Sequence, residues 1–224
     1  MKTTRREFIM NGSIVLGAAI CGMGLGGCLH SPNRATAGEI SFPEPSCGTD
    51  KGKEKQILVA YTSYCGSTGG VAEAIAQAFC EKGARVDVRL AKNVASIEGY
   101  RAVVVGSAVR AGSWRPEALS FVSQHEKTLA EMPVAYFLTC TALYRDTPES
   151  RRTALGYFDP VLKASPGVKP VDLGCFAGAL DYSKMGIIYR TVMKSKMKDK
   201  AVPEGDFRDW AAIKAWAETV LLKL

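Results

Sequence analysis

The sequence has 224 residues, of which 47% are hydrophobic and 23% are charged. This length and apolar content suffice for one ordinary domain with a real core, and they exclude a disordered chain. The formal net charge is +7, and removal of residues 1–27 would leave +5. Residues 184–200 alone carry six basic residues against Asp199, a surplus of the same size. The basic character is therefore one local patch without a recognisable nucleic-acid-binding motif, and we expect no nucleic-acid partner.

The N-terminal residues 1–27 are predicted to be an export signal rather than part of the fold. Arg5 and Arg6 precede a weakly apolar, glycine-rich stretch, which resembles a twin-arginine signal. Residues 25–28, Leu-Gly-Gly-Cys, resemble a lipoprotein cleavage box with Cys28 as the lipidated residue. We expect export by the twin-arginine route and anchoring through Cys28 on the outer side of the cytoplasmic membrane. An uncleaved membrane anchor is the alternative, although Asn11 and the glycines make a poor spanning helix.

Residues 28–55 are rich in Ser, Pro, Gly and charge and show no periodicity, so we expect a flexible tether before a folded domain at 56–224. The cysteines beyond the signal lack both C-x-x-C spacing and a histidine cluster, so no metal site is predicted. Three of them lie in apolar runs and are interpreted as core thiols: Cys80, Cys140 and Cys175. The others are Cys47 and Cys65, and the odd total leaves at least one free thiol or an intermolecular bridge.

The stretch 56–79 organises the rest of the domain. An apolar run at 57–61 predicts a buried strand, a hydroxyl-rich loop follows at 62–68, and apolar residues then recur at helical spacing. A helix N-terminus with free N–H groups and nearby hydroxyls favours anion binding. Because no Lys or Arg lies between Thr62 and Val71, we expect neutral donors only. A polar turn without a ligand is the alternative. Cys65 sits where a helix start lowers a thiol pKa, but we interpret it as a bystander.

The motifs that the loop lacks exclude several classes of ligand. The loop lacks the Gly-Lys-Ser/Thr ending of nucleoside-triphosphate sites and the G-x-G-x-x-G of dinucleotide sites. It also lacks the arginine that a tyrosine-phosphatase loop would place six residues after Cys65, where Val71 stands. What remains resembles the flavodoxin phosphate loop, a run of Thr and Ser residues broken by Gly that wraps the phosphate of FMN.

Further along, apolar runs alternate with amphipathic helices. We predict an edge strand at 85–90, where polar and apolar residues alternate, and buried strands at 102–106, 133–138 and 171–176. Helices are predicted at 116–130, 148–163 and 206–222. Strands alternating with helices indicate an α/β fold with a parallel sheet covered on both faces. Ligands of such sheets bind beyond the carboxyl ends of the strands, a rule for which flavodoxin itself is a standard example.

From Lys55 onward the chain resembles the flavodoxin-like protoporphyrinogen oxidases. The resemblance is carried by residues 106–112, by residues 174–182 and by the closing helix that contains Asp209 and Trp210. It implies a doubly wound, five-stranded parallel sheet in the order 2-1-3-4-5, FMN as cofactor, and an insertion before the last helix. Those oxidases face the cytoplasm and pass electrons to respiratory quinones. An exported relative can therefore have another substrate or electron partner.

The resemblance places the flavin against three strand-end loops. Trp114, Tyr144 and Tyr182 are candidate ring neighbours, and Arg110 is a candidate contact for an anionic flavin or an acidic substrate. As a plain alternative, each of these is a surface side chain. The full predicted cofactor site is Thr62, Ser63, Tyr64, Cys65, Gly66, Ser67, Thr68, Ser107, Ala108, Val109, Arg110, Trp114, Thr139, Cys140, Thr141, Tyr144, Gly178 and Tyr182. We assign no catalytic side chain, because the chemistry would belong to the flavin.

The insertion at 183–205 is predicted to form a helix with one apolar and one basic face, carried by residues 184–200. Such a helix suits anionic lipid, an acidic redox partner or a carboxylated substrate, and a solvated charge run is the plain alternative. The sequence thus favours an FMN-dependent oxidoreductase working with a quinone or a redox protein. Two alternatives stay open: an exported electron carrier without its own substrate, and a lipoprotein binding module that has lost its cofactor.

Overall fold

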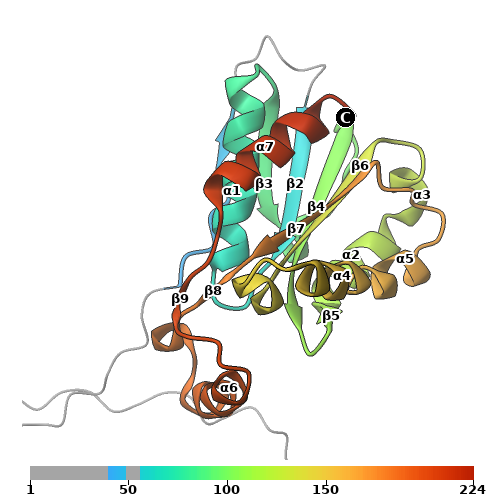
Figure 1. Ribbon diagram of the computed structural model, residues 1–224. Helices are drawn as coiled ribbons and strands as arrows, with labels where there is room; N and C mark the ends of the chain where they lie inside the picture. Colours follow the sequence, from blue (N-terminus) through green and yellow to red (C-terminus); the bar gives the residue numbers. More distant parts are fainter. Residues whose placement is uncertain (1–39, 49–55) are drawn as a thin grey trace, which may run out of the picture. The chain divides into compact units, whose positions relative to one another are not determined.

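The apolar runs of the sequence form one mostly parallel sheet in the order β1-β3-β2-β4-β6-β7 (Figure 1). The computed structural model describes residues 40–48 and 56–224. The strands are β1 (Ser46–Cys47), β2 (Gln56–Thr62), β3 (Arg85–Leu90), β4 (Ala102–Arg110), β6 (Val134–Cys140) and β7 (Asp172–Ala177). All neighbours from β3 to β7 pair in parallel. Numbered along the chain, these five strands have the order 2-1-3-4-5, which confirms the predicted fold class.

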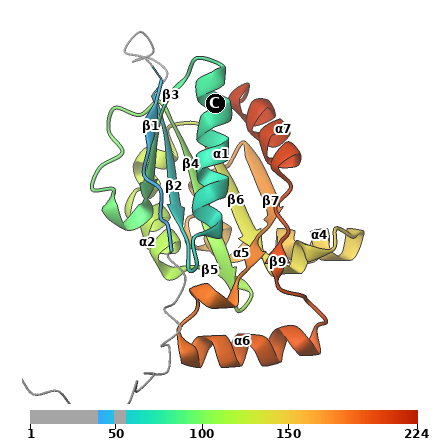
Figure 2. The same ribbon diagram turned by 90° about the vertical axis from the view of Figure 1, so that its left-hand side faces the viewer.

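Helices cover both faces of the sheet (Figures 1 and 2). Helices α1 (Ser67–Glu81) and α7 (Trp210–Leu221) pack on the face that carries Ile57 and Val59. The opposite face carries Leu58 and Ala60, because successive side chains of a strand point to opposite sides. It is covered by α2 (Pro116–Gln124), α3 (Glu126–Leu129), α4 (Pro148–Gly156) and α5 (Asp159–Ala164). Two separate cores, one per face, therefore hold the strands in register.

Two predicted helices are each divided. The helix expected at 116–130 is broken at His125 into α2 and α3, and the helix expected at 148–163 is broken into α4 and α5. Pro160 explains the second break, since a proline ring clashes with the carbonyl of the residue four positions earlier, here Gly156. In α7, the buried face is formed by Ile213, Ala217 and Val220, whereas Trp210 is 46% exposed.

The segment before β2 departs from the prediction. Residues 46 and 47 form β1, which pairs antiparallel with β3, so β3 is not an edge strand in the described sheet. Cys47 is disulfide-bonded to Cys80 of α1. The flexible tether predicted for 28–55 is therefore wrong for residues 40–48, and the core-thiol interpretation of Cys80 is wrong as well. The predicted signal at 1–27, Cys28 and the rest of the tether lie outside the described residues.

The insertion leaves the sheet after β7 and returns before α7. It contains β8 (Ala179–Leu180), a short turn η4 (Tyr182–Lys184), the helix α6 (Ile187–Asp199) and β9 (Gly205–Asp206), which pairs with β8. The remaining short elements are η2 (Ala91–Asn93), β5 (Ser113–Trp114) and η3 (Thr141–Tyr144). Figure 2 shows α6 lying across the edge of the sheet where the parallel strands end. Within residues 40–48 and 56–224, no helix has both the length and the apolar character needed to cross a membrane.

Candidate flavin site

The loop between β2 and α1 is held in place by two buried pairs of hydroxyl groups. The Thr62 hydroxyl donates to Ser107 Oγ at 3.1 Å, which ties the end of β2 to β4. The hydroxyl oxygens of Thr68 and Thr139 lie 2.7 Å apart and tie the start of α1 to the end of β6. All four side chains are at most 4% exposed. These predicted site residues thus hold the loop in place and point away from solvent.

The start of α1 carries free donors. Its N-cap residue, Gly66, has a φ of 88°, and no side chain of the described residues caps the helix. The Ser63 hydroxyl accepts the Gly66 N–H at 3.0 Å. The N–H groups of Ser67 and Thr68 occupy the first two helical positions, which have no acceptor within a helix. A Cβ at Gly66 would lie 2.8 Å from the Ser41 carbonyl oxygen, so the turn needs glycine.

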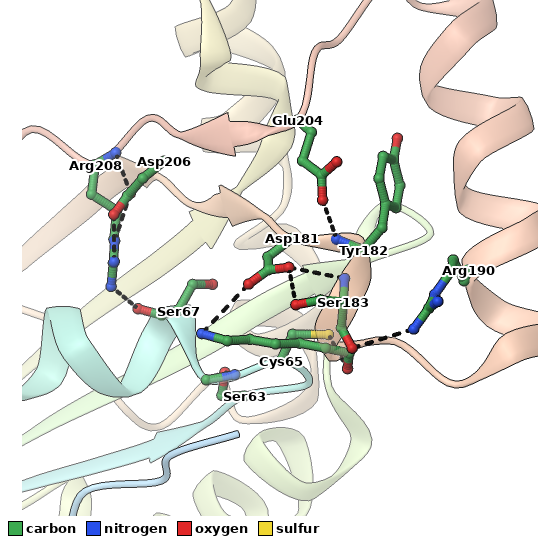
Figure 3. Close-up of polar contacts among 12 residues, drawn as sticks. Ser63, Cys65, Ser67, Asp181, Tyr182, Ser183, Arg190, Glu204, Asp206 and Arg208 are labelled. Atoms are coloured by element: carbon green, nitrogen blue, oxygen red, sulfur yellow. Dashed lines mark hydrogen bonds and ion pairs between the residues drawn. The ribbon is translucent and has the colours of Figure 1, made fainter. Parts of the chain in front are cut away.

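Cations reach this helix start from distant parts of the chain. A cavity of about 200 Å³ beside Ser67 is also lined by Lys184 and Arg208, together with the acidic Glu73 and Asp181. The Arg208 guanidinium donates to the Ser67 carbonyl at 3.3 Å (Figure 3). The expectation of neutral donors only is therefore wrong.

Two carboxylates fix these cations. Arg208 is oriented by Asp206, and its hydrogen bond holds the pKa of that carboxyl below the usual range. Asp181 accepts from the N–H and hydroxyl of Ser183 and lies 3.7 Å from the Lys184 ammonium. The basic groups at the helix start are therefore held in position before any ligand arrives.

Cys65 does not behave as a helix start alone would predict. Its thiol donates to the Lys184 carbonyl oxygen over 3.7 Å. Burial raises the pKa of this thiol, and the nearby Asp181 carboxylate raises it further. With its pKa raised, Cys65 is a protonated contact between the loop and the insertion.

A larger cavity of about 820 Å³ lies on the other side of the loop, within the range of small-molecule sites. Six of the predicted residues line it: Tyr64, Val109, Arg110, Cys140, Thr141 and Tyr144. They come from the ends of β2, β4 and β6. Burial raises the pKa of the Cys140 thiol to about 11, so this thiol adds no charge to the cavity.

The insertion covers the cavity. Residues of α6 that line it are Ile188, Tyr189, Val192, Met193, Lys196 and Met197. The Tyr189 ring lies 4.5 Å from the Tyr64 ring, centroid to centroid. The Arg110 guanidinium lies 5.0 Å from the Tyr64 ring and 4.8 Å from the Tyr189 ring. One arginine and two tyrosines therefore join α6 to the loops beneath it.

Two predicted ring neighbours lie elsewhere. Trp114 is 2% exposed, because β5 folds back on β4 and turns the indole into the core against Tyr136. Tyr182 does not line the cavity: its ring lies 5.2 Å from the Lys194 ammonium and its N–H donates to Glu204 (Figure 3). Both corrections have one cause, since a strand-end position does not fix the direction of a side chain.

The last two predicted residues lie near the loop. A Cβ at Gly178 would be 3.6 Å from Ser67 Oγ, an ordinary contact distance, so the chain after β7 passes beside the start of α1. Ala108 is half-buried and its carbonyl accepts from the Ser107 hydroxyl.

Sequence reasoning missed four residues of the site: Arg115, Lys184, Tyr189 and Arg208. The Arg115 guanidinium lies 5.3 Å from the Tyr64 ring and pairs with Glu117. Arg115 directly follows the loop at the end of β4, and this position could have identified it as a candidate site residue. Lys184 and Tyr189 lie in the insertion, which was predicted as an amphipathic helix without a role at the flavin site for either residue.

An anion-sized cavity at a helix start, next to a larger aromatic cavity at the carboxyl ends of a 2-1-3-4-5 sheet, defines a flavin-nucleotide-binding α/β protein. The chain belongs to the flavodoxin domain family, whose model matches residues 58–205. Membership of this family implies FMN as the cofactor.

The chain is also similar to named proteins. The chain is 29% identical over 173 residues to protoporphyrinogen IX dehydrogenase (quinone) of Leishmania major, covering 72% of this chain and 73% of that one. It is 27% identical over 148 residues to the enzyme of the same name from Escherichia coli K12, covering 64% and 79%. Among solved structures, oxidised flavodoxin 2 from Bacillus cereus is similar with a TM-score of 0.49 and 19% identity, covering 75% of this chain and 99% of that one.

The residues fit FMN. Free N–H groups at Ser67 and Thr68 with Arg208 and Lys184 nearby form a donor set for a phosphate. The cavity lined by Tyr64 and Tyr144 offers aromatic and apolar walls for a flat ring system.

Proposed function

We propose that this protein is an FMN-dependent oxidoreductase that oxidises a reduced, carboxylated tetrapyrrole of the protoporphyrinogen type. Its electrons would pass to a quinone or to a redox partner protein. The observation that carries the proposal is the 820 Å³ cavity, in which aromatic and aliphatic walls meet the cations Arg110, Lys196 and Lys200. The names of the two relatives at 29% and 27% identity support the same substrate class.

The roles of the side chains follow from their chemistry. FMN, when bound, supplies the electron-accepting chemistry. Ile188, Val192 and Tyr144 offer the apolar contact that a macrocycle needs, and the three cations offer partners for its carboxylates. The described residues that line the cavity include no carboxylate and no imidazole. The protein's part is therefore to bind and orient the substrate and to limit the access of water.

The test is steady-state oxidation of protoporphyrinogen by the FMN-loaded protein, with and without a short-chain quinone. We expect Arg110→Gln to raise KM about tenfold while the FMN dissociation constant changes less than threefold, since a lost charge-assisted contact is worth about 1.5 kcal/mol. The matched control is Arg152→Gln, an exposed arginine of α4 outside the cavity. A protein that holds FMN but does not turn over would be an electron carrier. A folded protein that never takes up FMN would be a binding module.

We further propose that the protein is exported and anchored through Cys28. The Cys47–Cys80 disulfide supports this location, because disulfides persist in oxidising compartments and are rare in the cytosol. The prediction is that cell fractionation recovers the protein with membranes and that Cys28→Ser releases it. Recovery of the wild-type protein in the cytosol, with Cys47 and Cys80 both reduced, would refute the proposed location.

A further inference from the structure

The outward side of α6 carries exposed apolar side chains. Ile187 is 82% exposed, Ile188 84% and Val192 46%. The inward side of the same helix holds Tyr189 and Met197, which pack with the rest of the insertion. The helix is thus already docked on the protein by one face, and its second apolar group remains in solvent.

Unpaired cations surround these side chains. Lys194, Lys196, Lys198 and Lys200 form no ion pair with any carboxylate among residues 40–48 and 56–224, while the only acidic residue of the segment is Asp199. Ile187, Lys194 and Lys198 are spaced seven and eleven residues apart, which places them on one stripe of an α-helix. The stripe therefore combines a large apolar side chain with two ammonium groups that have no carboxylate partner among the described residues.

We propose that α6 docks on an anionic lipid surface. In this arrangement Ile187 and its exposed neighbours enter the headgroup region, and Lys194 and Lys198 lie at the level of the lipid phosphates. A free inorganic anion or an acidic protein would use the lysines but has no need of an exposed isoleucine. The pairing of both groups on one stripe therefore selects lipid as the partner.

Docking also brings the cavity close to the lipid. Ile188, Val192 and Lys196 line the 820 Å³ cavity and are at the same time exposed on α6. With α6 on the membrane, the part of the cavity wall that these side chains form would lie next to the headgroups. The docking itself does not depend on the proposed enzyme activity.

The test is sedimentation of the full chain carrying Cys28→Ser with vesicles of phosphatidylcholine alone and of phosphatidylcholine with about one third phosphatidylglycerol. We expect binding to the anionic vesicles only. Ile187→Asp should weaken it at least tenfold, and Lys194→Gln with Lys198→Gln about 25-fold, or about fivefold for each lysine. These three residues do not line the cavity, and their exposure leaves the fold intact, which the thermal unfolding midpoint checks.

Matched controls change the same chemistry elsewhere. Leu222→Asp alters an 89% exposed leucine at the end of α7, and Lys163→Gln with Lys169→Gln removes two exposed lysines outside the insertion. Both should bind as the parent does, and inorganic phosphate at equal ionic strength should not displace the protein more than chloride. Unchanged binding of Ile187→Asp would overturn the proposal in favour of a charge-only partner. Unchanged binding of every α6 variant would overturn it in favour of a contact through residues 1–39.

Discussion

The phosphate loop at 62–68 and the helix α6 border the same cavity, but they are held by different forces. The loop lies between two buried strand ends, and its hydroxyls Thr62 and Thr68 are bonded inside the protein. By contrast, α6 is held by a small cluster of its own, made of Leu180, Met185, Met197 and Val202, and by the tilted ring contact between Tyr64 and Tyr189. The difference suggests a rigid side for the cofactor and an adjustable side for the substrate or membrane.

The largest effect is expected from removal of the Cys47–Cys80 disulfide, which holds residues 40–48 beside the loop. The disulfide fastens residues 40–48, and Tyr61 in turn donates to the Pro43 carbonyl beside the loop. Cys47→Ser with Cys80→Ser should lower the free energy of unfolding by about 2–4 kcal/mol. Denaturant unfolding with and without reductant measures it. A reductant effect on the wild type but none on the double variant would be consistent, whereas equal stability of all forms would show that the segment is held by other contacts.

A smaller effect is expected from the hydroxyl pair beneath the loop. Thr68→Val leaves the Thr139 hydroxyl buried without its partner and should cost about 1–3 kcal/mol of unfolding free energy. Adding Thr139→Val should cost less than the sum of the two single changes, because both unsatisfied groups are then gone. A double-mutant cycle based on denaturant unfolding measures the interaction energy between the two hydroxyls. Additivity within about 0.3 kcal/mol would mean that the two hydroxyls do not interact.

The next change loosens α6 instead. Tyr189→Ala removes the ring contact to Tyr64 and one of the two faces around Arg110, each worth about 0.5–1.5 kcal/mol. Amide exchange of α6 should speed up severalfold, while α1 keeps its rate and the FMN dissociation constant changes less than threefold. The control is Tyr100→Ala, which removes a partly buried tyrosine outside the insertion that hydrogen-bonds to Asp87. Equal loss of protection in α1 would erase the distinction between the two regions.

The smallest effect depends on pH. Asp206 has a lowered pKa because Arg208 donates to it, so its contribution to stability is full above the unfolded-state pKa of about 3.9. It is lost as the pH falls through the still lower pKa of the folded state. The thermal midpoint of Asp206→Asn should therefore lie slightly below that of the wild type from pH 5 to 8, with the gap closing below about pH 4. A gap that persists undiminished at pH 3 would show that the carboxylate charge is not its cause.

The sequence predicted what local patterns encode. A continuous apolar run predicted β2 as a buried strand, and a loop of hydroxyls and glycines before a helical period located the start of α1. These features need only neighbours in the chain, because a strand, a turn and a helix start each depend on a few consecutive residues.

The errors share a dependence on distant residues. Lys184 and Arg208 reach α1 only because the insertion folds back, and Cys47 finds Cys80 across 33 positions. Trp114 was misplaced because a two-residue strand reversed the chain at Ala111 and Gly112, both with positive φ. No rule based on the spacing of residues along the sequence predicts these contacts.

The most direct test of the flavin site is amide exchange of the whole protein with and without FMN, followed residue by residue. If FMN binds at the site described above, amide exchange should be slower at 63–69, 109–112 and 141–144, with the strongest protection at Ser67 and Thr68. FMN binding that leaves these segments unchanged and protects residues around Arg101 and Leu222, where another cavity of about 670 Å³ lies, would contradict it.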